Sequence, residues 1–226
     1  MLRLFCAAMN RMDSHCERNR LSHGMDLYYD LLHCLPAMLV VSELDTIVEQ
    51  SLRSFYEDIC SDWGGRENEM VNLYAHGHLA KFVRPQTILN DLSQIGIEVA
   101  VQQLPREVLL KWNPQAQKPK KDVRKDLVLW PSARMCLWKD NVPSNEPLAI
   151  MEWKVNHVRN HASHRKNQRD YPLDVNWLCG TSLRSEMENF IGYAVLLENT
   201  RTPKTLTCVR VQAGTAREFL RLPKSN

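Results

Sequence analysis

Hydrophobic residues recur every three or four positions in the first third of the chain and form short runs after it. The helical spacing covers residues 25–60, where Pro36 predicts an interruption between two helices, and again residues 67–82. Residues 1–23 show no clear period and are expected to form a weakly ordered or peripheral arm. The chain is therefore predicted to begin with helices.

Short apolar runs rich in β-branched residues predict the strands. They lie at residues 95–101, 108–112, 125–130, 148–155, 192–197 and 206–211, the last strand of the chain. Residues 113–121, with two prolines, are expected to be a loop, a helical stretch should follow His157, and residues 174–178 and 183–189 should be short helices around Gly180. This order predicts an α/β fold, with a helical extension over residues 1–62 and the main domain over residues 63–226.

Composition narrows the class of protein. The chain has 226 residues, 44% of them hydrophobic and 24% charged, which is typical of a globular protein that buries a sizeable core without disulfides or a structural metal. Its longest apolar run is too short for a bilayer, which predicts no membrane partner. The seven cysteines are scattered and never form C-x-x-C, which is typical of a reducing compartment. We therefore expect a cytoplasmic protein.

Charge is distributed unevenly between the two halves. Residues 1–100 hold 8 Lys and Arg against 14 Asp and Glu, a net of −6, and the remainder holds 21 against 12, a net of +9. The basic half is typical of a nucleic-acid-binding surface, and a solvated charged face is the alternative. The candidate nucleic-acid contacts are Lys120, Lys121, Arg124, Lys125, Arg159, Arg165 and Lys166.

Two predicted strands carry ionisable residues inside apolar runs. Asp126 lies in KDLVLW, and Glu152 and Lys154 lie two apart in LAIMEWKV, so their side chains share one face of a strand. Charged groups in such runs are costly unless they are paired, ligated or at the edge of a site. If the strands are neighbours, Asp126 and Glu152 could hold Mg²⁺ or Mn²⁺ while Lys154 assists a water or a phosphate. The alternative is a surface Glu–Lys pair and an Asp that caps the basic loop.

With an upstream glutamate on a helix, this pattern resembles the PD-(D/E)XK nuclease superfamily, which has the restriction-endonuclease-like fold. The resemblance covers roughly residues 66–212. It implies a mixed central sheet flanked by helices, in the order helix, three antiparallel strands, helix, strand. It also implies Mg²⁺-dependent cleavage of nucleic acid, in many such enzymes by a homodimer.

The family's functional residues carry over one by one. Its aspartate corresponds to Asp126, its second acidic residue to Glu152, its lysine to Lys154, and its helical glutamate to Glu67, with Glu69 as the competitor. The motif's proline is absent, and the long gap before Glu152 requires a hairpin or insertion containing Trp138. The leading hypothesis is a Mg²⁺-dependent endonuclease acting on DNA. The alternative is a non-catalytic nucleic-acid-binding or protein-interaction module on the same fold.

Two further patterns allow more than one interpretation. His157, His161 and His164 would share one face of a helix, either as a zinc site or as a polar face that touches phosphates or water. The tryptophans could stack on bases, although core packing explains most of them. Phosphate-binding loops of the G-x-x-x-x-G-K-[ST] and G-x-G-x-x-G types are absent from the sequence.

Overall fold

The computed structural model describes residues 21–59, 65–112, 121–135, 138–139, 142–143, 146–157, 161–184, 187, 189–200 and 202–223. The chain divides into two compact units, Met1–Ser42 and Glu43–Asn226, and the sheet lies in the second. Residues 1–20 of the expected arm and residues 113–120 of the expected loop lie outside the described residues. The predicted domain boundary after residue 62 stays a prediction. No helix in the described ranges is long and apolar enough to cross a membrane.

The helices differ from the predictions in two places. Helix α2 runs unbroken over Leu21–Ile59, so the predicted interruption at Pro36 is wrong; proline removes one backbone hydrogen bond, but its fixed φ is compatible with a helix. Residues 108–112 belong to helix α4 (Arg106–Trp112) and not to a strand. The carbonyl of Pro105 accepts hydrogen bonds from the backbone of Val108 and Leu109, which starts the helix.

The predicted helix over residues 67–82 is one continuous helical run with changing geometry. It consists of α3 (Glu67–Asn72), a π-helical segment (Leu73–His78) and a 3₁₀ segment (Leu79–Phe82). A second 3₁₀ turn, Leu92–Gln94, leads into the first strand. Two short strands, β3 (Trp138–Lys139) and β4 (Val142–Pro143), pair within the insertion that precedes Glu152.

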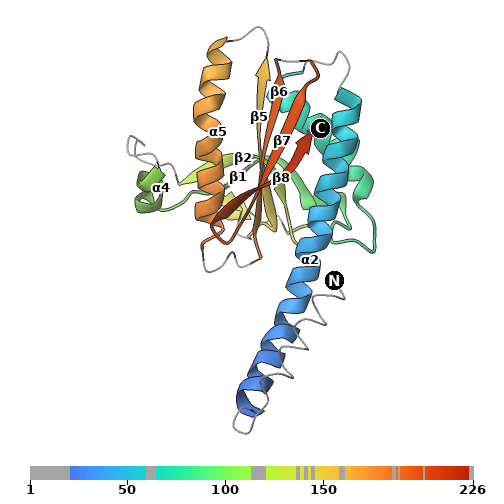
Figure 1. Ribbon diagram of the computed structural model, residues 1–226, viewed down its shortest axis with the longest axis vertical. Helices are drawn as coiled ribbons and strands as arrows, with labels where there is room; N and C mark the ends of the chain where they lie inside the picture. The colour runs from blue at the N-terminus through green and yellow to red at the C-terminus, as the bar shows by residue number, and fades with distance from the viewer. Residues whose placement is uncertain are drawn as a thin grey trace. The chain divides into compact units, whose positions relative to one another are not determined.

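Six strands form one mixed sheet in the order β1-β2-β5-β6-β7-β8 (Figure 1). Their bounds are β1 Ile95–Gln102, β2 Asp122–Leu129, β5 Ala149–His157, β6 Ile191–Asn199, β7 Thr205–Gln212 and β8 Thr215–Leu222. Only the β5–β6 pair is parallel among these neighbours, and helix α5 (His161–Thr181) connects its two strands. The predicted α/β class, with a mixed sheet flanked by helices and an N-terminal helix, is confirmed.

Strand β8 was not predicted, because its pattern is dominated by exposed charges. It follows β7 through a turn in which Ala213 and Gly214 have φ of 46° and 72°, and only Leu220 and Leu222 are buried in it. Helix α5 is also longer than the predicted pieces, since Pro172 lies on its exposed side and does not end it. The described residues between 183 and 189 are mainly turns and contain no α-helix.

Helices cover both faces of the sheet within the second unit (Figure 1). On one face, Val128 and Ile150 form a buried cluster with Trp177 and Leu178 of α5. On the other face, the ring of Trp153 lies 5.3 Å from Phe55 of α2 and 5.1 Å from Tyr74 of the π-helical segment. The alternation of a strand thus sends Glu152 and Lys154 toward the α5 face while Trp153 fills the opposite core.

Candidate functional site

The site lies where β2 and β5 diverge. Their ladder covers only three residue pairs, Leu127 with Met151, Val128 with Ile150, and Leu129 with Ala149. Beyond it, the backbone N–H of Trp153 donates to Asp126 Oδ2 at 2.7 Å, and the backbone N–H of Val155 donates to the Glu67 carboxylate. Two carboxylates therefore replace strand β2 as acceptors along this edge of β5, which fixes both of them beside Glu152 and Lys154.

A backbone irregularity turns Lys125 into the interior. Ile97 pairs with Leu127 and Val99 pairs with Lys125, but Glu98 between them has a φ of 54°, a conformation that is uncommon for a residue other than glycine. Past this point Val99 packs into the α5 cluster, and the Lys125 ammonium lies 3.6 Å from the centre of the Trp177 ring. Simple alternation would place Lys125 on the same face as Leu127, which is the face of the sheet away from α5.

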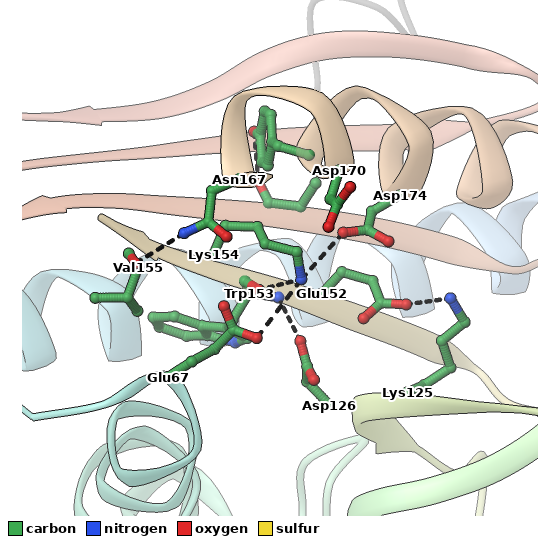
Figure 2. A network of polar contacts seen from close by, with 12 residues as sticks. Glu67, Lys125, Asp126, Glu152, Trp153, Lys154, Val155, Asn167, Asp170 and Asp174 are labelled. Carbon is green, nitrogen blue, oxygen red and sulfur yellow. Dashed lines mark hydrogen bonds and ion pairs between the residues drawn. The ribbon is translucent and has the colours of Figure 1, made fainter. Parts of the chain in front are cut away.

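Lys125 and Glu152 form a buried ion pair. Their side chains are 4% and 5% exposed, and Lys125 Nζ donates to Glu152 Oε1. Figure 2 shows the two groups meeting from neighbouring strands. Burial raises the pKa of the Glu152 carboxyl, the ammonium of Lys125 opposes this rise, and the nearby carboxylate of Asp126 adds to it. Even beside Lys125, the pKa of Glu152 is raised to about 8, so this carboxyl takes up a proton more readily than an ordinary glutamate.

Lys154 is held by a different set of partners. Its Nζ donates to the carbonyl of Trp153 at 2.7 Å and lies 3.1 Å from Asp174 Oδ2 and 3.6 Å from Glu67 Oε1 (Figure 2). Burial works to lower the pKa of Lys154, but the surrounding carboxylates, Asp174 foremost, outweigh it and the pKa is raised. Lys154 is therefore an ammonium at neutral pH.

The structure separates the two candidate helical glutamates. Glu67 reaches Lys154, whereas Glu69 Oε2 accepts a hydrogen bond from the backbone of Arg66 at 2.6 Å and caps its own helix. Burial raises the pKa of Glu67, although the charge of Lys154 opposes this. Of these two acids, Glu67 is the one that lies beside Lys154.

Asp174 was missed by the sequence analysis, which placed it at the start of a short helix. It lies on the inward stripe of α5, with Asn167 seven residues earlier and Leu178 four residues later, both buried. Burial raises the pKa of Asp174, while Lys154 and Lys125 act to lower it. An acidic residue on an otherwise buried helical stripe was the available signal, but Pro172 and Gly180 obscured the period.

The cluster offers carboxylate oxygens of the kind that a divalent cation binds. Four carboxylates (Glu67, Asp126, Glu152 and Asp174) accompany two ammonium groups (Lys125 and Lys154), a surplus of two negative charges when all are ionised. Carboxylate oxygens are the ligands that Mg²⁺ prefers, and Glu152 already binds one cation, the ammonium of Lys125. The donor atoms are of the type that Mg²⁺ or Mn²⁺ binds. No group of three His, Cys, Asp or Glu residues is arranged as a metal site among the described residues.

The predicted nucleic-acid contacts that the structure describes differ in exposure. Lys121 and Arg124 are exposed at the start of β2, and Arg124 lies 3.8 Å from Glu98, but Lys125 is buried and cannot contribute to a surface. Lys120 and Arg159 lie outside the described residues, and Arg165 and Lys166 lie on α5. The predicted histidine face is wrong, because His157 ends β5 whereas His161 and His164 belong to α5.

Three of the tryptophans belong to the core. Trp130, Trp153 and Trp177 are buried in the described part of the chain, as core packing predicts.

Comparisons with protein-family models, with curated proteins and with solved structures found no match to this chain.

Proposed function

We propose that the protein is a Mg²⁺- or Mn²⁺-dependent nuclease of the PD-(D/E)XK type that hydrolyses phosphodiester bonds in DNA. The observation that carries the proposal is the convergence of Asp126, Glu152 and Lys154 at the point where β2 and β5 diverge. These are the residue types, in the chain order, that the resemblance requires.

The order of elements also supports the proposal. A helical run (residues 67–82), three antiparallel strands (β1, β2 and β5), a helix (α5) and a strand parallel to β5 (β6) follow one another. This is the topology that the resemblance to the restriction-endonuclease-like fold implies. Strands β7 and β8 extend the sheet beyond it.

Each residue of the cluster has a distinct role in this proposal. Asp126 and Glu152 would hold the divalent cation, which when bound lowers the pKa of a water and offsets charge on the phosphate. Lys154, charged at neutral pH, would bind the phosphate oxygen that gains negative charge. Glu67 fixes the edge of β5 through Val155 and restrains Lys154 from the side opposite Asp174.

One observation favours a second candidate, a non-catalytic nucleic-acid-binding or protein-interaction module. Glu152 is already neutralised by the buried ammonium of Lys125, which occupies the carboxylate that the nuclease needs for its cation. In a nuclease, Lys125 has to release Glu152; in a binding module it does not. The two candidates therefore differ in their response to divalent cations.

The test is digestion of supercoiled plasmid, single-stranded DNA and RNA by the full chain in Mg²⁺, Mn²⁺ or chelator. Lys154→Ala is compared with the wild type, and Lys81→Ala, an exposed lysine on the 3₁₀ segment, is the matched control. We expect cation-dependent cleavage that is lost in Lys154→Ala and kept in Lys81→Ala, with thermal unfolding showing that both variants are folded.

Either contrary result is informative. Equal cleavage by the wild type and Lys154→Ala contradicts the role of Lys154 and indicates a contaminant. Binding of DNA that weakens with salt and is the same in chelator, without cleavage, favours the binding module.

A further inference from the structure

The cluster contains a carboxylate to which the motif assigns no role. Asp174 enters it from α5, whereas the other acids come from α3, β2 and β5. Its Oδ2 is buried and accepts no hydrogen bond within the described part of the chain. The ammonium of Lys154, 3.1 Å away, is what compensates its charge.

Helix α5 is fixed against the sheet on both sides of Asp174. Asn167 donates to the carbonyl of Val155 at 2.9 Å, and Tyr171 donates to the carbonyl of Ala194 at 3.1 Å. Three residues after Asp174, the Trp177 indole donates to Gln103 Oε1 at 2.6 Å. These bonds leave the Asp174 carboxylate little freedom relative to β5.

The two acids that flank Lys154 are not equivalent. Asp174 Oδ2 lies 3.1 Å from Lys154 Nζ and Glu67 Oε1 lies 3.6 Å away. Asp174 is also less exposed, 22% against 38%, so solvent screens its charge less. Figure 2 shows the Lys154 ammonium between them, with Asp126 and Glu152 on either side of the same strand segment.

We infer that Asp174 is a positioning residue, whose carboxylate holds the ammonium of Lys154 at the place where Asp126 and Glu152 meet. The inference rests on the proposed nuclease function for its effect on cleavage, but the ion pair itself is testable without cleavage. A flexible lysine has four side-chain torsions to fix, and a fixed anion 3.1 Å away reduces the entropy lost when a phosphate binds.

The chain provides a closely matched control. Asp170 lies one turn earlier on α5, its side chain is 24% exposed, and it pairs with Arg169 at 3.0 Å (Figure 2). Asp170→Asn therefore removes the same charge from the same helix at the same depth without removing a partner of Lys154. Asp174→Asn keeps the shape of Asp174, and Asp174→Glu keeps its charge.

The first measurement is NMR of the lysine ammonium groups in the ¹⁵N-labelled full chain, with Lys154 assigned by the signal lost in Lys154→Met. An ammonium held by an ion pair exchanges slowly with water and gives a visible signal. We expect the Lys154 signal in the wild type, Asp170→Asn and Asp174→Glu, and its loss in Asp174→Asn. An unchanged Lys154 signal in folded Asp174→Asn overturns the inference.

The second measurement is cleavage kinetics on plasmid DNA. Asp174→Asn should lower kcat by up to about 100-fold with little change in KM, because misplacing a functional group by about 1 Å can cost that much. Asp174→Glu should restore most of the rate, and Asp170→Asn should match the wild type. An unchanged kcat in Asp174→Asn overturns the inference even if the NMR signal is lost.

The two proposals fail in different ways. A wild-type chain that does not cleave any substrate contradicts the nuclease, and the effect of Asp174 on cleavage falls with it. Loss of the Lys154 signal in Asp174→Asn would then still support the ion pair. Cleavage by the wild type that Asp174→Asn retains contradicts only the positioning role.

Discussion

The buried pair of Lys125 and Glu152 can be tested by a double-mutant cycle that needs no assumption about function. Both side chains are at most 5% exposed, and Lys125 also lies over Trp177. Removing one partner leaves the other charge buried without compensation, which costs about 3–5 kcal/mol. Typical domains have a free energy of unfolding of about 5–15 kcal/mol, so either single variant should lose a large share of its stability.

We expect Lys125→Met and Glu152→Met each to be destabilised by about 3–5 kcal/mol and the double variant to lie within about 1 kcal/mol of the wild type or above it. Burial already raises the pKa of Glu152, and removing Lys125 removes the interaction that lowers it. The lone carboxyl in Lys125→Met can therefore take up a proton. The pKa of Glu152 is already about 8 with Lys125 present and rises further without it, so the stability deficit of Lys125→Met relative to the wild type should shrink as the pH falls toward 8 and change little between pH 7 and 5.

The assay is urea unfolding followed by tryptophan fluorescence, with a constant denaturant slope as the check that the unfolded states are alike. The control is Arg124→Met, next to Lys125 in the sequence. It removes an exposed ion pair with Glu98 and should cost about 0–1 kcal/mol. Single variants as stable as the control, or a double variant that loses the sum of the two, would refute the buried pair.

Two further predictions concern the helical face opposite α5. Burial and Lys81 lower the pKa of His78, while Asp58 opposes them. The unfolded chain therefore takes up the proton first, and the folded state loses stability as the pH falls below 6.5, by at most about 1.4 kcal/mol per pH unit. His78→Gln should not show this loss. The raised pKa values of Glu67, Glu152 and Asp174 give the opposite slope, but they are present in both proteins and cancel when the two are compared. If the free energy of urea unfolding has the same pH dependence in the wild type and His78→Gln, the prediction is contradicted. Tyr193→Phe removes the hydroxyl that donates to Asp45 at 2.6 Å and should cost about 1.5–3 kcal/mol, whereas Tyr171→Phe, which loses a bond to a carbonyl, should cost about 0.5–1.5 kcal/mol in the same assay. Equal losses would show that the charge of Asp45 adds nothing.

The parts of the fold that could be predicted are those in which one physical preference dominates. Apolar β-branched runs identified β1, β2, β5, β6 and β7, because buried strands need little else. The intruding charges of Asp126, Glu152 and Lys154 identified the cluster, because such residues in apolar strands need partners, and the structure brings all three together. Glu67 was expected from the resemblance, with Glu69 as the competitor, and the structure places Glu67 beside Lys154.

The parts that could not be predicted depend on local conformation. The interior position of Lys125 follows from the positive φ of Glu98 on the neighbouring strand. Neither a glutamate nor a lysine in the sequence predicts such a backbone conformation. Asp174 was hidden because Pro172 and Gly180 suggested breaks in a helix that continues through both. Strand β8 was hidden because charges occupy its outward positions.

The position of Lys125 is also where the two candidate functions separate. A buried Lys–Glu pair adds little to stability compared with apolar residues of similar size, so stability alone gives no reason for the pair. In the proposed nuclease, the Lys125 ammonium would compensate Glu152 until a divalent cation binds, and the cluster would balance that cation with the surplus of two negative charges that it carries when all its groups are ionised. In a binding module the same surplus would repel a polyanion from the site. When its groups are ionised, the charge of the cluster therefore favours the proposed nuclease over the proposed binding module.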